Sequence, residues 1–489
     1  MKDLIESLVD EIGPGHMAST AYDTAWAARL GEVDWSLSTR ALAWLAENQL
    51  SDGSWGARAP FYYHDRVLCT LAAMIALSYR GRRGQDKMQI ERGRLALERI
   101  VGGATQGLQS DPNGATVGFE IIAPTLAVEA EKLGLIKNQG NRILGRLSKL
   151  RAKKIGFLEN KMINRHVTMA FSAEMAGLDG EHMLDIENLQ EENGSVAVSP
   201  SATAYYAACI RPGEETALNY LRSVIKDDGG MPNVAPFDVF EIAWTLWNLS
   251  LIPGLEKNGR LQPHIDFLSN AWQPKRGVGF AAGYSVTDSD DTGLVYDTLL
   301  RFGKEKDLAS VLMFEEKEHF RCFALEANPS ISANIHVLGA LGAAGLDRKN
   351  SSVEKVLRFL QKARGVNPYW VDKWHSSPYY ATSHAIIACA NVATDLVDEA
   401  VQWILQTQNR DGSWGTYIST AEETAYAIQA LWFWNQNVAK VPENVLKQGA
   451  RWLTEHMDQP YPPLWIGKCL YSPNLVIRSA VISALALSQ

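Results

Sequence analysis

The sequence QLSDGSWG at residues 49–56 returns as QNRDGSWG at residues 408–415. Each copy follows a stretch of helical periodicity that carries a tryptophan, Trp44 before the first and Trp403 before the second. A decayed copy, QEENGS, occupies residues 190–195. Aspartate or asparagine followed by glycine supplies the positive φ of a tight turn, and a tryptophan there packs the turn onto its neighbours. The repeat is therefore predicted to be helix, glycine turn, helix, a unit that buries its apolar face against further copies in solenoids or closed α-toroids.

Helical signals extend over the whole chain, whereas alternating β-branched runs are scarce. Residues 420–423 (TAEE) form a capping box, Ser199-Pro200 is typical of a cap followed by a first-turn proline, and Ser330 begins a helix that Gly345 ends. The chain is predicted to be all-α. One repeat lies near each end, which indicates two helical barrels, with LIPG at residues 251–254 as the linker between them.

The composition excludes several classes of function. A chain of 489 residues is expected to hold two or three domains. The net charge is −8 and no basic tract occurs, which argues against nucleic acid as a partner. No apolar run reaches the about 18 residues of a membrane span, and residues 1–10 lack the apolar block of a signal peptide. Five scattered cysteines without a C-x-x-C pair favour a reduced, cytoplasmic protein without a structural zinc.

A second stretch, TDSDDT at residues 287–292, places Asp288, Asp290 and Asp291 between apolar, aromatic segments. Either Asp290 or Asp291 could cap the helix predicted over residues 294–302. Like charges this close, in apolar surroundings, disfavour ionisation, so one carboxyl is expected to stay neutral at pH 7 and to serve as an acid. A solvated acidic turn and a divalent-metal loop are the alternatives that the spacing leaves open.

Such an acid needs a partner that holds its proton in one geometry. His336, on the helix predicted to begin at Ser330, is the candidate, and it would also offer a route for reprotonation after each turnover. A histidine that is simply satisfied within the core is the alternative.

A phosphate-bearing substrate would need cations, and lysines and arginines occur in DKW at residues 372–374 and RAKK at residues 151–154. Solvated surface charge is the alternative for each. No P-loop or G-x-G-x-x-G is present. Tryptophan faces could stabilise a carbocation, although most tryptophans are expected to pack the core. Those that lie in apolar segments are Trp244, Trp247, Trp272, Trp370, Trp374 and Trp465.

With these residues in view, the chain resembles the bacterial class II diterpene cyclases of the copalyl diphosphate synthase kind, over nearly its whole length. The motifs that carry the resemblance, besides the two repeats, are DSDDT (288–292), STAYDTAW (19–26), GFE (118–120), SPSATA (199–204), GMPNV (230–234) and DKW (372–374). The resemblance implies an isomerase that protonates an alkene of geranylgeranyl diphosphate and closes two rings. No D-D-x-x-D motif is found, so ionisation of the diphosphate is not expected.

The resemblance also implies a βγ pair of α-barrels with the active site between them. Residues 1–35 and 255–489 would form the β barrel with the acid motif, and residues 36–254 the inserted γ barrel. Asp290 would be the general acid, Asp288 and Asp291 supporting carboxylates, and His336 the acid's hydrogen-bond partner. The substrate-binding positions would be Lys373, Arg151, Lys154, Asn233, Phe171 and Trp374. Glu120 matches a glutamate associated with Mg²⁺, which would assist diphosphate binding.

One position departs from the plant labdane-forming relatives, where a histidine stands in place of Phe171 and works with an asparagine, matched by Asn233, to hold a deprotonating water. Phenylalanine cannot act as a base, and its ring face could attract a nearby carbocation. We therefore expect a rearranged kolavenyl (clerodane) or halimadienyl (halimane) diphosphate as the product. Unrearranged copalyl diphosphate is the alternative within the family.

Two rivals come from other classes. Inverting glycosidases also use α-toroids with paired carboxylates, but their acid and base come from separate segments, and residues 288–291 are too close for that geometry. A non-catalytic toroid that serves as a binding module is the other rival. As a cyclase, the protein would pass its product to a downstream class I diterpene synthase or to a phosphatase.

Overall fold

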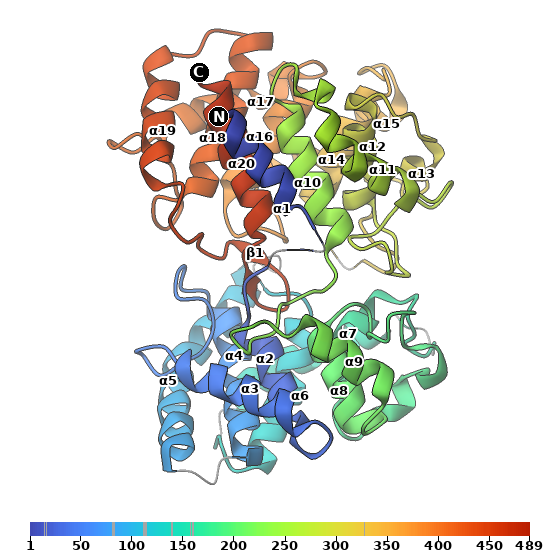
Figure 1. Ribbon diagram of the computed structural model, residues 1–489, viewed down its shortest axis with the longest axis vertical. Coiled ribbons are helices and arrows are strands. Elements are labelled where there is room, and N and C mark those ends of the chain that lie inside the picture. The colour runs from blue at the N-terminus through green and yellow to red at the C-terminus, as the bar shows by residue number, and fades with distance from the viewer. Residues whose placement is uncertain are drawn as a thin grey trace.

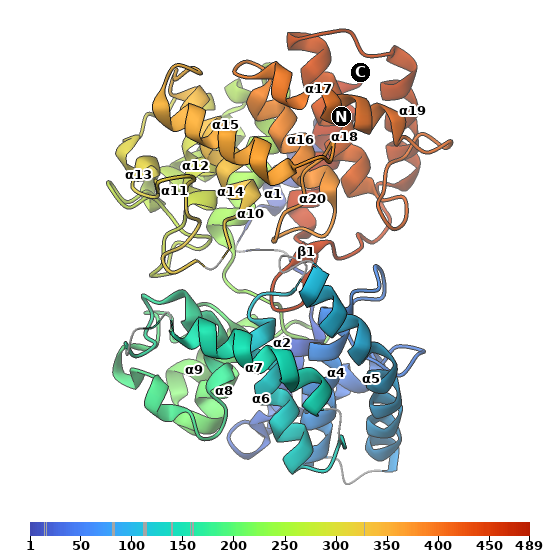
Figure 2. The same ribbon diagram turned by 180° about the vertical axis from the view of Figure 1, so that it is seen from behind.

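The computed structural model describes residues 1–13, 15, 17–80, 84–110, 115–137, 140–156, 158, 161–326 and 328–489. Its helices form two units stacked along the long axis of the molecule (Figure 1), and the view from behind shows the same division (Figure 2). In the described part of the chain, strand structure is confined to the short antiparallel pair β1 (Trp465–Ile466) and β2 (Leu470–Tyr471). The all-α prediction is confirmed.

The upper unit in Figure 1, here called the upper barrel, is a closed ring of helices. Each inner helix contacts the next, and the last contacts the first. The inner helices are α10 (Asp238–Ser250), α12 (Ser289–Arg301), α14 (Ile331–Ala343), α16 (Pro378–Cys389), α18 (Ala421–Asn437) and α20 (Asn474–Leu487). The outer helices are α11 (Gln262–Ala271), α13 (Ala309–Leu312), α15 (Ser351–Arg364), α17 (Thr394–Gln406) and α19 (Glu443–His456). The first helix of the chain, α1 (Lys2–Glu11), packs against α20 and completes the outer layer.

The inner and outer helices differ in burial as their sequences require. In α12 every residue from Ser289 to Leu299 is buried, as expected for a helix that other helices surround. In α15 the buried apolar residues fall on one face, at Val353, Val356, Leu357 and Leu360, and its other faces are polar. The upper barrel therefore has an inner ring of buried helices and an outer ring of amphipathic ones.

The lower barrel is built in the same way from α2–α9. Its inner ring runs through α2 (Ala21–Ala28), α4 (Tyr63–Arg80), α6 (Phe119–Lys132), the 3₁₀ segment η2 (Thr168–Ala176) and α8 (Pro200–Tyr205), which contacts α2 again. The outer helices are α3 (Trp35–Glu47), α5 (Gly84–Ser110), α7 (Gly140–Gly156) and α9 (Glu215–Val224). Short 3₁₀ or π turns complete this barrel: η1 (Leu30–Glu32), η3 (Glu181–Met183), η4 (Ile186–Asn188) and η5 (Tyr206–Ile210). Two further 3₁₀ turns, η6 (Leu255–Lys257) and η7 (Gly259–Leu261), belong to the upper barrel, where they contact α10 and α11.

The predicted repeats are the turns that lead from an outer to an inner helix. In the first, the Gln49 side chain donates to the carbonyl of Gly53 (2.9 Å), and the Trp55 indole donates to the carbonyl of Leu45 (2.8 Å). Gly53 has φ +90°, and a Cβ there would lie 2.6 Å from the carbonyl oxygen of Arg92, so glycine is required. The copy at residues 408–415 repeats both hydrogen bonds. The prediction of helix, glycine turn, helix is confirmed.

The boundaries between the barrels lie elsewhere than the sequence indicated. Helix α2, expected in the β barrel, belongs to the lower barrel, and α10, expected in the γ barrel, belongs to the inner ring of the upper barrel. Residues 251–254 are a turn within the upper barrel and not a linker. The chain passes between the barrels twice, between α1 and α2 and between α9 and α10. Helical periodicity alone does not say to which barrel a helix belongs, because both barrels repeat the same unit.

The β1–β2 hairpin joins the two barrels. Its backbone reaches Asp65 on α4, whose carboxylate accepts hydrogen bonds from the amides of Leu470 (2.9 Å) and Ala57 (2.7 Å). The amide of Val117 donates to the carbonyl of Gly467 (2.8 Å). The hairpin therefore docks into the lower barrel through buried hydrogen bonds. Among the described residues, no helix is both long and apolar enough to span a membrane.

Candidate active site

A largely apolar cavity lies between the barrels and takes residues from both. The lower barrel contributes Val117, Gly118, Ile121 and the η2 segment, and the upper barrel contributes α10, the acid motif and the β1–β2 hairpin. Its aromatic lining comprises Phe171, Phe237, Phe240, Phe280, Tyr284, Phe323, Trp374, Trp465 and Tyr471. Of the six tryptophans considered from the sequence, Trp374 and Trp465 line this cavity, and phenylalanine supplies much of the remaining aromatic surface. An isoprenoid chain would be surrounded by ring faces and kept from water.

The acid motif lies at the N-terminus of α12, and all three aspartates line the cavity. The helix is capped by Asp288, whose side chain accepts a hydrogen bond from the amide of Asp291 (2.8 Å). The expectation that Asp290 or Asp291 is the cap was therefore wrong, because the helix begins at Ser289, before its apolar periodicity starts. Capping by Asp288 leaves Asp290 and Asp291 free to face the cavity.

Burial governs the charge state of the motif. It raises the pKa of Asp288 to about 8; the negative charge of Asp290 adds to this rise, and the Asp291 amide opposes it. The pKa of Asp291 is raised well above its usual range by burial and then by the charges of Asp288 and Asp290. Burial therefore favours the neutral form of both supporting carboxyls, whereas the sequence had led us to expect one neutral carboxyl that serves as the acid.

Asp290 is held by two hydrogen-bonding groups of α14. Its Oδ1 lies 2.6 Å from Nδ1 of His336, the partner expected from the sequence, and its Oδ2 lies 3.3 Å from the hydroxyl of Ser332. Both helices are inner helices of the upper barrel and pack against each other, which fixes this geometry. The prediction that His336 contacts Asp290 agrees with the structure, whereas Ser332 was missed, because a serine in an apolar helix gives no sequence signal.

On the side away from Asp290, the ring of His336 contacts another histidine. Nε2 of His336 lies 2.9 Å from Nδ1 of His384 on α16, and burial together with the nearby His336 and His375 holds the pKa of His384 well below its usual range. His384 was not found from the sequence. The expectation that His336 offers a route for reprotonation gains no support, because its outer nitrogen meets a buried, neutral histidine and not the surface.

The DKW motif anchors the helix that carries His336. Asp372 accepts hydrogen bonds from the amides of Ile331 (2.9 Å) and Ser332 (3.0 Å), which are unpaired donors at the N-terminus of α14. Its second oxygen accepts from the Ser332 hydroxyl (2.9 Å) and from the amide of Trp374 (3.0 Å). Asp372 therefore fixes the start of α14 and so the position of His336. The sequence had pointed to this motif for Lys373 and Trp374, and not for Asp372.

Of the cations expected to bind diphosphate, Lys154 and Lys373 line the cavity, one from each barrel. Lys373 pairs with Glu326 and lies over the ring of Trp374 at 4.9 Å, and Lys154 pairs with Glu120. Arg151 does not line the cavity; its guanidinium donates to the carbonyl of Met175 (3.1 Å), and burial lowers its pKa. Arg151 lies on the same outer helix as Lys154, α7, and the three positions between them leave the two side chains about 60° apart around the helix axis.

Phe171 and Asn233 both line the cavity, as expected for residues that act on the substrate. The amide nitrogen of Asn233 donates to Asp23 (2.8 Å), so its oxygen is the atom left without a partner among the described residues. The ring of Phe171 lies 4.6 Å from the ammonium of Lys468, a fully buried lysine of the hairpin. Lys468 also pairs with Glu174 (2.7 Å) and donates to Ser199 and Ser201. The quadrupole of Phe171 thus already serves a protein cation, which weakens the expectation that it attracts a substrate cation.

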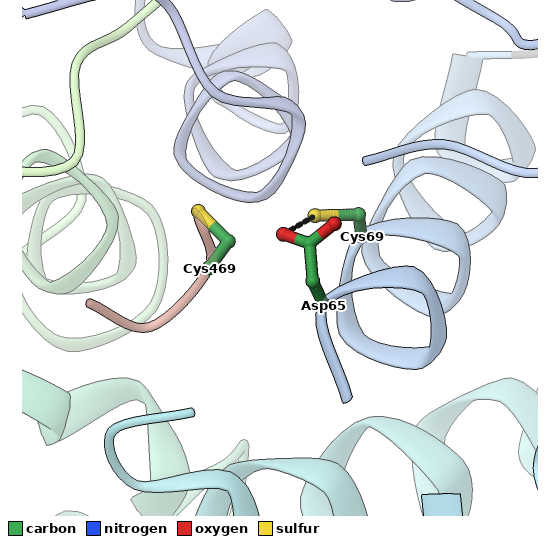
Figure 3. A group of neighbouring side chains, drawn as sticks. All are labelled: Asp65, Cys69 and Cys469. Carbon is green, nitrogen blue, oxygen red and sulfur yellow. Dashed lines mark hydrogen bonds between the residues drawn. The ribbon is translucent and has the colours of Figure 1, made fainter. Parts of the chain in front are cut away.

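Metal binding was considered at two places. Asp65, Cys69 and Cys469 come together where the hairpin meets α4, as Figure 3 shows, and they are the one group of three such ligands in the described part of the chain. Both oxygens of Asp65 already accept backbone hydrogen bonds, and burial raises the pKa of both thiols, so the group does not favour a cation. The five cysteines are all unpaired. Glu120 lies in the first turn of α6 and pairs with Lys154, and its carboxylate is of the ligand type that Mg²⁺ prefers.

Comparisons with known proteins agree with this geometry. A family model described as the squalene-hopene cyclase C-terminal domain matches residues 322–460. The type B diterpene cyclase of Mycobacterium tuberculosis is 47% identical over 479 residues, a match that covers 96% of each chain. An ent-copalyl diphosphate synthase of a Streptomyces species is 29% identical over 474 residues, covering 91% of this chain and 87% of that one. The structure of ent-copalyl diphosphate synthase from Streptomyces platensis matches with a TM-score of 0.80 at 29% identity and covers 100% of this chain and 98% of that chain.

Two α-barrels that enclose an apolar cavity, with a buried aspartate motif opening into it, define the class as that of the class II terpene cyclases. Within this class, the extent of the 47% match places the chain in the family of bacterial class II diterpene cyclases, and it is an enzyme of that type. The glycosidase and the non-catalytic binding module are thereby set aside.

Proposed function

We propose that the enzyme protonates geranylgeranyl diphosphate at its terminal alkene and cyclises it to a rearranged bicyclic diphosphate. The observation that carries the proposal is the carboxyl of Asp290, which opens into an apolar cavity and is held from behind by His336 and Ser332. An alkene is a poor base, so its protonation needs a strong acid at fixed distance in a dry site. Asp290 is the proposed general acid, with Asp288 and Asp291 as supporting carboxyls.

The diphosphate is proposed to bind between Lys154 and Lys373, which approach the cavity from opposite barrels. Each lysine pairs with a glutamate, so binding would exchange a carboxylate for a phosphate group. Glu120, once released by Lys154, would be the protein ligand for Mg²⁺, and bound Mg²⁺ would neutralise phosphate charge. Lysine acts here as a point charge, which tolerates a diphosphate in more than one orientation.

The product is proposed to be a kolavenyl or halimadienyl diphosphate, because Phe171 cannot hold a deprotonating water beside Asn233. The rival product, copalyl diphosphate, would need a base near Asn233, whose carbonyl oxygen is available as a hydrogen-bond acceptor.

The test is incubation with geranylgeranyl diphosphate, enzymatic dephosphorylation, and product structure by mass spectrometry and NMR. A halimane or clerodane alcohol is expected. Copalol as the main product would refute the rearrangement, and geranylgeraniol alone would refute the substrate. Phe171→His should divert part of the flux to an unrearranged labdane, because a histidine there could hold a deprotonating water together with Asn233. An active Phe171→His enzyme with an unchanged product would show that Phe171 does not set the outcome.

The setting of the reaction is likewise a proposal. The product would keep its diphosphate, so a downstream class I diterpene synthase or a phosphatase is needed to remove it. A cytoplasmic location is proposed from the unpaired state of all five cysteines, which reducing conditions maintain.

A further inference from the structure

His384 forms the end of a hydrogen-bonded chain that begins at the acid. Its Nδ1 lies 2.9 Å from Nε2 of His336, whose Nδ1 lies 2.6 Å from Oδ1 of Asp290. Nε2 of His384 has no hydrogen-bond partner among the described residues. The ring of Trp247 stacks on the His384 ring at 4.5 Å, with the planes 17° apart, so the imidazole is held in one orientation. Both histidines are buried, with 4% and 3% of their surfaces exposed.

Only one of the two possible proton arrangements leaves no buried N–H unpaired. His384 is neutral, because burial lowers its pKa, and so carries one N–H. If His336 donated to His384, the proton of His384 would lie on Nε2 and meet no acceptor in the described structure, a costly state for a buried donor. If His384 donates from Nδ1, its Nε2 carries only a lone pair, which is the smaller cost.

The second arrangement sets the proton of His336. Its Nε2 then accepts from His384, so a neutral His336 carries its hydrogen on Nδ1, where it donates to Oδ1 of Asp290. With Oδ1 accepting, the proton of Asp290 lies on Oδ2, the oxygen near the Ser332 hydroxyl. In the opposite tautomer, Nδ1 of His336 would be an acceptor, and the proton of Asp290 would lie on Oδ1 in a hydrogen bond to the histidine, where it is not free for an alkene.

We propose that His384 is a positioning residue that fixes the tautomer of His336, and through it the oxygen on which Asp290 holds its proton. The proposal rests on the role of Asp290 as the acid, proposed above, and adds a residue that does not line the cavity. Histidine is suited to this position because it offers a donor at Nδ1 together with a ring that stacks on Trp247.

The test compares two substitutions, each of which keeps one of these two properties, the donor or the stacked ring. His384→Asn keeps an N–H donor near the position of Nδ1 but loses the stacked ring; His384→Phe keeps the ring but has no donor. If His384 positions the proton, His384→Phe should lower kcat by about 10- to 100-fold with little change in KM, the range found when a supporting hydrogen bond is lost. His384→Asn should recover most of kcat even where its melting temperature is the lower of the two.

A purely structural role predicts the opposite order, since the phenylalanine variant retains the packing. A kcat for His384→Phe equal to or above that of His384→Asn would therefore overturn the proposal, as would an equal loss in both. Failure of the acid assignment is distinguished by a separate variant. If Asp290→Asn proved fully active, Asp290 would not be the acid, and neither His384 variant can produce that result.

A measurement on the unaltered enzyme covers the case in which neither variant folds. In ¹⁵N-histidine-labelled protein, with the His336 signals assigned by their loss in His336→Ala, the nitrogen shifts should show the hydrogen on Nδ1. A hydrogen on Nε2 of a neutral His336 would overturn the proposal.

Discussion

Asp290→Asn removes the proposed acid with little change of shape, and the surroundings of Asp290 indicate that the variant will fold. The carbonyl oxygen of the asparagine can take the place of Oδ1 and accept from His336. Its amide nitrogen would then lie where Oδ2 lies, within reach of the Ser332 hydroxyl, which Asp372 holds in place. Because both contacts can be kept, we expect the free energy of unfolding to change by no more than about 1 kcal/mol.

The rate should fall far more than the stability. Loss of a general acid costs about 10²- to 10⁴-fold, which at 1.36 kcal/mol per tenfold raises the barrier by about 2.7 to 5.4 kcal/mol. We expect the upper part of this range, because neither neighbour is placed to replace the acid. Asp288 is tied to the start of α12 by the Asp291 amide, and no hydrogen bond to His336 is found for either neighbour in the described structure.

The assay is single-turnover conversion of geranylgeranyl diphosphate, read by mass spectrometry after dephosphorylation, together with a melting curve. Asp297→Asn is the matched control, since Asp297 is a buried aspartate of the same helix that does not line the cavity. It should keep its rate within about threefold, because the asparagine oxygen can still accept from Trp247, although loss of the ion pair between Asp297 and Arg301 should lower its melting temperature. A folded Asp290→Asn enzyme within tenfold of the native rate would refute the assignment of the acid.

The remaining predictions concern His336, Lys373 and Asp288. His336→Ala should lower kcat about 100-fold with little change in KM, because the contact orients the acid and does not bind substrate; a change in KM alone would indicate a binding role. Lys373→Ala should weaken diphosphate binding about 10- to 100-fold, and an equal loss for a phosphate-free analogue would show that its pairing with Glu326 is only structural. The pKa of Asp288 is about 8 in the folded protein, which is above its value in the unfolded chain. Asp288 therefore contributes fully to the free energy of unfolding below about pH 4, and this contribution is lost as the pH rises towards 8. Asp288→Asn should therefore melt at a progressively higher temperature than the wild type between pH 5 and pH 8, and a difference that does not change with pH would contradict the raised pKa.

The fold was predictable from the sequence to the extent that local signals determine it. Glycine turns, caps and 3.6-residue periodicity each depend on neighbours along the chain, so the turn at Gly53 and the helix that begins after Ser330 agree with the structure. The assignment of α2 and α10 to the wrong barrels has the opposite cause. Which ring a helix joins depends on contacts with segments more than a hundred residues away, and no pattern within the helix encodes them.

The residues of the site follow the same rule: those with a local sequence signal were predictable, and those that act through distant contacts were not. The acid motif and His336 were recognisable because their residue types are unusual in an apolar segment. Asp372, Ser332 and His384 act through contacts with other segments of the chain. Alone, each is an ordinary polar residue, Asp372 in the loop before α16 and the other two within helices. Lys468 was also missed, since a lysine in a short loop is expected at the surface, whereas here it is fully buried among Glu174, Ser199 and Ser201.

The neutral state of the two supporting aspartates bears directly on the strength of the acid. If Asp288 and Asp291 were ionised, their charges would oppose the loss of a proton from Asp290, because a second and third negative charge would lie beside the carboxylate that forms. Burial keeps both protonated at neutral pH, so the carboxylate that forms on Asp290 is opposed by no neighbouring anion of the motif. The new charge is met instead by the imidazole of His336 and the hydroxyl of Ser332. The apolar wall makes ionisation of Asp288 and Asp291 costly, and so it also removes the charge repulsion that would weaken Asp290 as an acid. This explains why three carboxyls within four residues can serve a reaction that uses one proton.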